Sequence, residues 1–349
     1  MGTALKINLI WNRFRHHSGH SGYDQISRFL GNGISILNIQ ESTASWIPWK
    51  IAKLLIASSG LVRVGYTVRS FYAEEIIMHN ILTKNNQIYH FIYGENSYRY
   101  SGILNKCRGN KIISTYHFPP NLLDKTIPNK KYLKRLSAII VVGSNQVSYF
   151  THIVGEEKVF LVPHGIDTDF FHPPEIKTNN GTCLFVGMHL RDYKMMKETI
   201  TMISGRDKDI KFVVISDKER FGYFIDLPNV LLKSEITEME LLEFYRTSDL
   251  LVLPLIDCTA NNSILEALAC GLPVITTDVG AIRDYVDEDC AVLVPPKDTN
   301  RLADEIQRLL QNDSLRAAMT LNCRRKALHF DWRQISKQMI KVYQQVFCQ

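Results

Sequence analysis

The sequence lacks the features that mark several large classes of protein. Its seven cysteines form no C-x-x-C pair, and an odd number of scattered thiols suits reduced cysteines better than a disulfide or zinc framework. The apolar stretch near the N-terminus is short and is broken at once by arginine and histidine, so no secretory signal is predicted. No glycine fingerprint G-x-G-x-x-G follows the first predicted strand, which disfavours a dinucleotide-dependent oxidoreductase. We therefore expect a cytoplasmic protein whose cysteines bind no metal.

Length and composition predict a folded protein of two domains. The 349 residues are 45% hydrophobic and 22% charged, as in soluble globular proteins. A chain of this length is longer than a single hydrophobic core usually organises. The net charge of +6 is unevenly divided, since residues 1–165 carry 19 Lys and Arg against 8 Asp and Glu, whereas the remainder carries 22 against 27. The basic half is suited to anionic membrane, acidic glycan or nucleic acid, or is a solvated surface that keeps the protein soluble.

Short apolar runs alternate with helix-length segments, which indicates βαβ units and mainly parallel sheets. The fold class is therefore α/β, with two Rossmann-like domains. Strands are predicted at 6–11, 34–39, 87–93, 111–117 and 138–144, and then at 182–189, 210–216, 229–234, 250–256, 272–278 and 291–296. Helices of the second half are predicted at 237–248, 263–269 and 299–311.

The domain boundary is predicted in the run VPHGIDTDFFHPPE, where a glycine turn is combined with three prolines. A final amphipathic helix, FDWRQISKQMIKVYQQVF, has no strand after it and is suited to packing back across the first domain. We therefore assign 1–163 together with 330–349 to the first domain, and 164–329 to the second.

An anion site is predicted where the strand at 250–256 gives way to a helix. Asn262 or Ser263 can cap a helix that opens at Ile264, and the free backbone N–H groups of such a helix start attract a diphosphate. The residues of this loop are the candidates for donor binding: Thr259, Ala260, Asn261, Asn262 and Ser263.

Charged side chains near this helix start and beyond another strand end extend the candidate site. Glu266 is expected in the first turn of the helix, where its carboxylate either binds a ribose diol or complements the helix dipole. Gly187 ends a strand, and Arg191 and Lys194 follow it. The forked guanidinium of Arg191 and the ammonium of Lys194 are both suited to binding phosphate oxygens. Alternatively, Arg191 and Lys194 are solvated residues of a surface loop.

The motifs of the second half resemble a known family. HGID at 164–167, FVG with the following Lys194, and LEALACGLPVITTDVG at 265–280 look like the donor-binding half of the family 4 glycosyltransferases. The resemblance covers about 163–296. It implies the GT-B fold, in which a deep crevice separates two Rossmann-like domains and a C-terminal cross-over helix, here FDW and the residues after it, lies against the first domain.

By this resemblance Glu266 corresponds to the second glutamate of an E-x7-E motif and binds the ribose, while Lys194 neutralises the diphosphate. Ile236 occupies the position that packs the base, or is a buried residue at a helix start. His117 corresponds to a histidine near the donor sugar, or is a structural residue at a strand end.

The sequence departs from the family pattern at three places. Cys258, with Asp257 beside it, stands where the first glutamate of the motif is expected. Met188 replaces the arginine that often follows FVG, and Arg191 is the candidate to supply that charge. The loop TANNS replaces a glycine-rich sequence, although its backbone amides remain available.

The first strand is followed by HHSGHSGYDQ, in which Gly19 and Gly22 allow a close approach of the backbone to phosphate or sugar. The three histidines of this run have no acidic or cysteine partner at ligand spacing, so no metal is expected there. The D-x-D sequence at 167–169 is interpreted as a linker turn, and no metal site is predicted.

The segment at 45–69 mixes Trp46, Trp49 and aliphatic residues with lysine and arginine. It is either an amphipathic helix that lies in a membrane interface or a core-facing helix with lysines on its wet side. It is too short and too charged to span a bilayer.

Together with the resemblance, these patterns predict an enzyme that transfers a hexosyl unit from a UDP- or GDP-sugar to a hydroxyl of a glycan or lipid-linked acceptor. Retention of configuration is implied by the resemblance. No metal or other cofactor and no nucleic-acid partner are expected, and a membrane contact would place the protein at the inner face. Because Cys258 replaces a carboxylate, the alternative is a sugar-nucleotide-binding protein without turnover.

Overall fold

The computed structural model describes residues 5–11, 19–31, 34–39, 47–58, 66–127, 129–177 and 179–348. The chain divides into two compact units. The first unit comprises Met1–His17, Gly22–His164 and Trp332–Gln349, and the second comprises Ser18–Ser21 and Gly165–Asp331. The expected division differs chiefly at Ser18–Ser21, whose described residues are bound to the second unit by hydrogen bonds.

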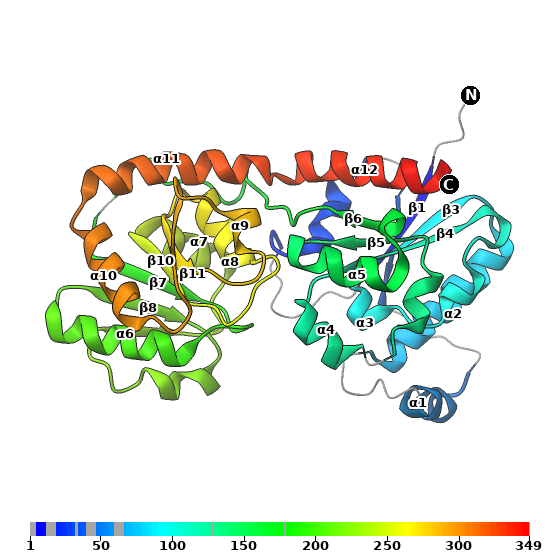
Figure 1. Ribbon diagram of the computed structural model, residues 1–349, viewed down its shortest axis with the longest axis horizontal. Coiled ribbons are helices and arrows are strands. Elements are labelled where there is room, and N and C mark those ends of the chain that lie inside the picture. The colour runs from blue at the N-terminus through cyan, green and yellow to red at the C-terminus, as the bar shows by residue number, and fades with distance from the viewer. Residues whose placement is uncertain are drawn as a thin grey trace. The chain divides into compact units, whose positions relative to one another are not determined.

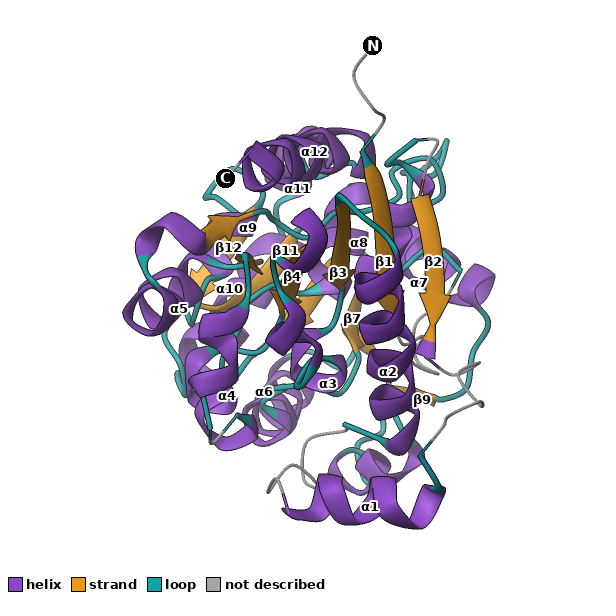
Figure 2. Cartoon of the chain, turned by 90° about the vertical axis from the view of Figure 1, so that its right-hand side faces the viewer, coloured by secondary structure: helices purple, strands orange, loops and turns teal. Residues whose placement is uncertain are grey.

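The first unit is built on a parallel sheet with the strand order β2-β1-β3-β4-β5-β6 (Figure 1). In Figure 2, β2, β1, β3 and β4 lie side by side. All six residues of β4 are buried, as expected for a parallel strand covered on both faces. The strands are β1 (Lys6–Trp11), β2 (Ile34–Asn38), β3 (Gln87–Phe91), β4 (Lys111–Tyr116), β5 (Ala138–Val141) and β6 (Val159–Leu161).

Helices and short 3₁₀ turns connect these strands. The longer helix α2 is opened by a capping box, in which the Thr67 and Ser70 side chains each accept a hydrogen bond from the other residue's backbone N–H. The helices are α1 (Trp49–Ser58), α2 (Val68–Thr83), α3 (Gly94–Ser97), α4 (Pro120–Thr126), α5 (Val147–Val154) and α12 (Trp332–Cys348).

Helix α12 belongs to the first unit and buries seven of its side chains. Tyr343 of α12 places its hydroxyl oxygen 2.7 Å from Nδ1 of His90, which lies on β3. The other ring nitrogen of His90 lies 2.7 Å from the Thr115 hydroxyl oxygen on β4. The buried imidazole thus links two strands to the C-terminal helix.

The second unit has a parallel sheet with the order β12-β11-β10-β7-β8-β9. The strands are β7 (Thr182–Val186), β8 (Lys211–Ile215), β9 (Val230–Lys233), β10 (Leu250–Leu253), β11 (Val274–Thr277) and β12 (Ala291–Val294). The helices are α6 (Tyr193–Arg206), α7 (Glu238–Thr247), α8 (Asn262–Ala269), α9 (Ile282–Tyr285), α10 (Thr299–Leu310) and α11 (Asp313–His329).

The α/β class with two parallel sheets is confirmed. Most predicted strands extend too far at their carboxyl ends, where polar residues such as His117 leave the sheet and enter turns. Strand β6 and helices α6 and α11 were not predicted. The side chains on α11 do not separate into apolar and polar faces, so its seventeen residues give little periodic signal.

No helix among the described residues is both long enough and apolar enough to cross a bilayer.

The buried His90 predicts that acid destabilises the first unit. Burial lowers the pKa of His90 from 6.5 to about 3. Because this folded-state value lies below that of the unfolded chain, stability present above pH 6.5 is lost as the pH falls from about 6.5 toward 3. The loss approaches about 1.4 kcal/mol per pH unit in that window. Urea unfolding between pH 7 and 4.5 measures it, and His90→Gln is expected to flatten the slope.

His79 is exposed on α2 and provides the matched control. His79→Gln is expected to keep the wild-type dependence on pH. An unchanged slope in His90→Gln would show that another group causes the acid sensitivity.

Candidate functional site

The junction between β10 and α8 forms the helix start that the sequence predicted, with a different cap. Asn261 is the N-cap residue, and its side-chain oxygen accepts a hydrogen bond from the Ile264 N–H at 3.3 Å. The prediction of Asn262 or Ser263 as the cap was wrong, because the helix already opens at Asn262. Thr259 and Asn261 are buried, as is every residue of α8 except Asn262.

Glu266 is buried in the second turn of α8, so its predicted place in the first turn was wrong. Its Oε1 accepts a hydrogen bond from the Ser21 hydroxyl at 2.5 Å, and its Oε2 accepts one from the Tyr245 hydroxyl at 2.7 Å. Burial raises the pKa of Glu266, while the two hydroxyl groups counter part of that effect. The carboxylate therefore lies in surroundings built from hydroxyl donors.

Arg191 is buried, and all three guanidinium nitrogens donate hydrogen bonds within the second unit. They reach the carbonyl oxygens of Val186 at 2.9 Å and His189 at 2.8 Å, and the Ser263 hydroxyl at 3.0 Å. A Cβ atom at Gly187, whose φ is +89°, would lie 2.7 Å from this guanidinium. The structure thus brings Gly187, Arg191 and Ser263 together, and the hydrogen bonds of Arg191 link the end of β7 to the start of α8.

Lys194 does not join that cluster. It lies in the first turn of α6, its side chain is 84% exposed, and its Nζ is 3.9 Å from a Glu198 oxygen on the same helix. A surface pair of this length contributes little to stability.

Residues 19–21 are bound to the second unit by several polar contacts. Glu238 accepts hydrogen bonds from the backbone N–H groups of Gly19 at 3.2 Å and His20 at 2.8 Å. The His20 Nδ1 lies 2.6 Å from an Asp167 oxygen, and the ring stacks on Phe170 with centroids 3.9 Å apart. Together with the bond from Ser21 to Glu266, these contacts explain why this segment belongs to the second unit.

The remaining donor-site candidates lie at turns. Gly22 has a φ of +101° and precedes the first 3₁₀ turn, in the first unit. Ile236 is half-buried and directly precedes Thr237, the N-cap of α7. Ala260 is half-buried in the loop before α8. Among the described residues, no group of three or more His, Cys, Asp and Glu is placed to hold a metal ion.

Cys258 is a buried thiol at the position where the resemblance implies a carboxylate. Burial raises the pKa of Cys258 to about 12, so the side chain is neutral. Its backbone oxygen accepts a hydrogen bond from the Ala281 N–H at 2.9 Å, beside Gly280. The loop after β10 is therefore tied to the turn after β11.

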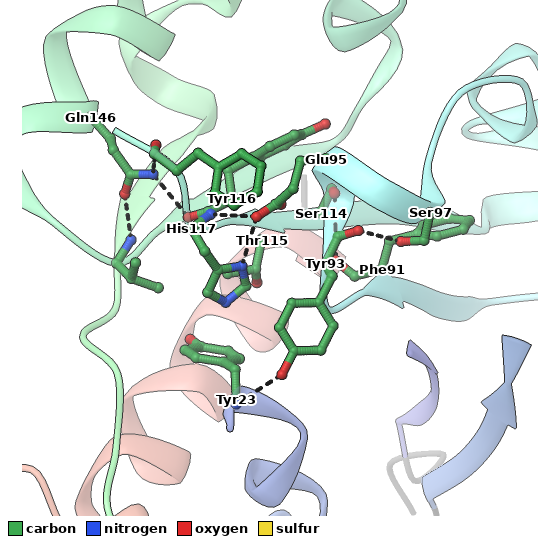
Figure 3. Close-up of polar contacts among 12 residues, drawn as sticks. Tyr23, Phe91, Tyr93, Glu95, Ser97, Ser114, Thr115, Tyr116, His117 and Gln146 are labelled. Atoms are coloured by element: carbon green, nitrogen blue, oxygen red, sulfur yellow. Dashed lines mark hydrogen bonds and ion pairs between the residues drawn. The ribbon is translucent and has the colours of Figure 1, made fainter. Parts of the chain in front are cut away.

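In the first unit, His117 lies directly after β4 within a cluster of polar and aromatic side chains (Figure 3). Glu95 is buried, and its Oε1 accepts a hydrogen bond from the His117 N–H at 3.2 Å and lies 3.4 Å from Nδ1 of the ring. The Gln146 amide nitrogen donates to the carbonyl oxygens of Tyr116 at 3.0 Å and Phe118 at 2.9 Å, one on each side of His117.

Sequence reasoning missed Ser21, Tyr245, Glu95 and Gln146. Each lies far along the chain from its partner, by 21 to 245 residues, and of the four only Ser21 falls in a run that the sequence singled out, HHSGHSGYDQ. Glu95 offered a weak signal, because a carboxylate just after a predicted strand lies at the edge where parallel sheets place their ligands.

The turn at Gly280 predicts that a single added methyl group strongly lowers the stability of the protein. Its φ is +58°, and an added Cβ would lie 2.0 Å from the Cys258 backbone oxygen. Gly280→Ala is therefore expected to lower the free energy of unfolding by at least about 2 kcal/mol, as measured by urea denaturation. Gly205→Ala, in α6 with open space around it, is the control and is expected to be neutral or to stabilise by about 0.5–1 kcal/mol. Equal unfolding midpoints for the two variants would contradict the steric argument.

Comparisons with known proteins agree with this architecture. Residues 180–312 match the family model described as glycosyl transferases group 1. The D-inositol 3-phosphate glycosyltransferase of Xylanimonas cellulosilytica is 24% identical over 65% of this chain and 61% of its own length. An uncharacterized glycosyltransferase of Methanocaldococcus jannaschii is 24% identical over 78% of this chain and 86% of its own. In three of the curated relatives, the part that this chain matches spans between 25% and 61% of the relative's own length.

Among solved structures, the sucrose-phosphate synthase of Thermosynechococcus elongatus superposes with a TM-score of 0.69 at 19% identity, over 98% of this chain and 100% of that one. This likeness concerns the fold. The two-domain α/β architecture is that of the GT-B glycosyltransferases, and most of the second unit matches the group 1 glycosyltransferase family.

Proposed function

We propose that the chain transfers a hexosyl unit from a UDP- or GDP-sugar to a hydroxyl of a glycan or lipid-linked acceptor, with retention of configuration. One observation carries this proposal: Glu266 is a buried carboxylate beside a helix start, and both of its oxygens are bound by hydroxyl groups. A ribose diol presents hydroxyl groups to a carboxylate in the same way. The match of residues 180–312 to group 1 glycosyltransferases supports the same assignment.

The diphosphate would be held at the start of α8 without a metal ion. Backbone N–H groups at Asn262 and Ser263 lie in the first turn, where the helix dipole favours negative charge. Arg191 acts indirectly, because its guanidinium binds Ser263 and fixes this turn. Lys194 is proposed to contact the diphosphate directly, since among the described residues its exposed side chain makes only the weak contact with Glu198.

The start of α8 and the nearby cations are proposed to act on the reaction by stabilising the diphosphate leaving group. As the bond from the anomeric carbon to the diphosphate breaks, negative charge grows on the phosphate oxygens. Fixed dipoles and cations that face this charge stabilise the transition state more than the ground state. His117 is proposed to contact the donor sugar.

A second candidate is a sugar-nucleotide-binding protein without turnover. Cys258 favours it, because a neutral buried thiol cannot replace the hydrogen bonds of a carboxylate to a sugar. Nucleotide released from UDP- and GDP-sugars in the presence of cell membranes distinguishes the enzyme from the binder.

Helix α1 supports a peripheral membrane contact of the first unit. Ala52 and Ile56 are buried in a cluster with Tyr66 and Phe71, whereas three apolar side chains of the helix are exposed. These are Trp49 at 52%, Ile51 at 49% and Leu54 at 69% exposure.

Lys50 and Lys53 lie between these apolar residues of α1, and Figures 1 and 2 show α1 at the edge of this unit. Apolar anchors with interspersed lysines suit an anionic lipid interface. Trp46 lies outside the described residues.

Nucleotide binding provides the first test. UDP or GDP is expected to raise the melting temperature of the wild type in a thermal-shift measurement, and the effective nucleotide identifies the base. Glu266→Gln and Lys194→Ala are each expected to weaken nucleotide affinity about tenfold or more, because each removes one charged partner. Glu243→Gln, at an exposed position on α7, is the control and should bind as the wild type does.

Unchanged affinity and turnover in both variants would contradict the proposed site. Loss of turnover on addition of a chelator would contradict its independence from metal.

Vesicle binding tests the surface of α1. The wild type is expected to sediment with phosphatidylglycerol vesicles more than with phosphatidylcholine vesicles, and salt should weaken the binding. Trp49→Ser with Leu54→Ser is expected to reduce the bound fraction several-fold, because apolar area is lost. Leu321→Ser, which alters an exposed leucine on α11 of the second unit, is the control. Equal sedimentation of all three proteins would contradict a membrane role for α1.

A further inference from the structure

The hydroxyl group of Tyr245 fixes one of the two oxygens of Glu266. It donates a hydrogen bond to Oε2 at 2.7 Å, and both residues are buried, with Tyr245 fully enclosed and Glu266 4% exposed. A tyrosine side chain has few rotatable bonds, so it holds its hydroxyl group in place at a low cost in side-chain entropy. Oε2 is therefore bound by a rigid partner within the second unit.

Helix α7 also holds the segment that binds the other oxygen. Glu238 and Tyr245 lie on α7 at positions i and i+7, which share one face of a helix. Glu238 accepts hydrogen bonds from the two backbone N–H groups that directly precede Ser21, and the Ser21 hydroxyl binds Oε1 of Glu266. One face of α7 thus positions the partners of both carboxylate oxygens.

Tyr245 is also linked to the buried Arg191. The Arg191 guanidinium donates a hydrogen bond to the Ser263 hydroxyl at 3.0 Å. Burial and the charge of Glu266 raise the pKa of Tyr245, whereas a hydrogen bond with the Ser263 side chain counters part of this rise. The phenol is therefore neutral and retains the proton that it donates to Glu266.

Burial disfavours the charge on Glu266, and hydrogen bonds oppose this effect. Burial raises the pKa of Glu266, whereas the hydroxyl groups of Ser21 and Tyr245 lower it because they bind the ionised form. An ionised carboxylate accepts hydrogen bonds at both oxygens, but a protonated carboxyl group loses part of this capacity. A ribose diol, whose hydroxyl groups donate, therefore requires the ionised form.

The charged neighbours of Glu266 act on it through space. Glu238 raises the pKa of Glu266, and Arg191 lowers it. Arg324 of α11 also approaches α8, but it donates to the carbonyl oxygen of Ala269 at 2.9 Å, at the last residue of that helix. Within the described ranges of the chain, no cation forms an ion pair with Glu266, so its direct contacts are with hydroxyl donors.

We propose that Tyr245 is a positioning residue for nucleotide binding, whose hydroxyl group keeps Glu266 ionised and holds Oε2 in place. The ribose is then received at Oε1, the oxygen that Ser21 binds. This inference rests on the proposed function for its ligand. The effect of Tyr245 on the charge of Glu266 does not depend on that function, and Tyr245 acts without touching the nucleotide.

The first experiment measures the charge of Glu266 and needs no nucleotide. The full chain is labelled with ¹³C at the glutamate carboxyl groups, and Glu266→Gln identifies the signal of Glu266. Tyr245→Phe removes only the hydroxyl group. Because the ionised form loses a hydrogen bond, the midpoint of the Glu266 titration is expected to move up by about one pH unit or more. Tyr223→Phe, at an exposed tyrosine of the second unit, is the control and should leave this midpoint unchanged.

The second experiment measures nucleotide affinity against pH, with UDP or GDP, whichever stabilises the wild type. As the pH is lowered, Glu266 is protonated, and the affinity of the wild type is expected to fall toward that of Glu266→Gln. In Tyr245→Phe this fall should begin about one pH unit or more higher, so within that window the variant binds up to about tenfold more weakly. Ionisation of the nucleotide itself affects both proteins equally.

A purely structural tyrosine would give a different pattern. Tyr245→Phe would then lower the melting temperature and weaken binding at every pH, without moving the acid-induced fall in affinity. The Glu266→Gln background provides a further check, because its residue 266 cannot titrate. Adding Tyr245→Phe to that background is expected to leave the pH dependence of binding unchanged.

The two experiments separate this inference from the proposed function. Failure of both UDP and GDP to bind would overturn the proposed function, and the carboxyl titration would still decide the role of Tyr245. An unchanged titration midpoint of Glu266 in Tyr245→Phe would overturn the inference. An upward shift of the acid-induced fall that persists in the Glu266→Gln background would also overturn it.

Discussion

Parallel strand pairing is the constraint on which both sites depend. In a parallel sheet every strand ends at the same edge, so the loops that follow neighbouring strands are brought together by backbone hydrogen bonds alone. In the first unit, Glu95, His117 and Gln146 follow β3, β4 and β5, which are neighbours in the sheet. In the second unit, Arg191 follows β7 and Cys258 follows β10, again neighbours. The chemistry of each site is therefore assembled by the sheet order.

Within that arrangement, charged groups are held by neutral partners. Arg191 donates to two carbonyl oxygens and one hydroxyl, and Glu266 accepts from two hydroxyl groups. Neither forms an ion pair among the described residues. Buried charges that are satisfied by dipoles remain able to act on an incoming charged or polar ligand, whereas a tight buried ion pair would neutralise both members.

Much of the fold could be read from the sequence, because alternating apolar runs and helix-length segments report burial directly. Gly271 follows Cys270, the C-cap of α8, with a φ of +69°, a conformation that glycine adopts readily at helix ends. The site was harder to predict. Asn261 rather than its neighbours caps α8, and the choice among adjacent polar residues depends on where the loop leaves β10.

Contacts across long stretches of chain were beyond sequence reasoning. Ser21 meets Glu266 across 245 residues, and only the folded backbone brings them together. Arg191 and Lys194 look equivalent as cations near a strand end, yet one is buried and bonded whereas the other is exposed. Arg191 precedes the N-cap Asp192 and binds Ser263, whereas Lys194 lies inside the first turn of α6, and no composition rule distinguishes them.

The bond between Ser21 and Glu266 has a thermodynamic consequence for any ribose that comes to this carboxylate. Each carboxylate oxygen can accept more than one hydrogen bond, so an incoming hydroxyl either joins the Ser21 hydroxyl at Oε1 or replaces it. Replacement exchanges one O–H···O⁻ contact for another, and the net gain then comes from elsewhere on the ligand. Loss of the serine contact would also leave residues 19–21 with the contacts of Glu238 and Asp167, so occupancy of this position is transmitted to that segment.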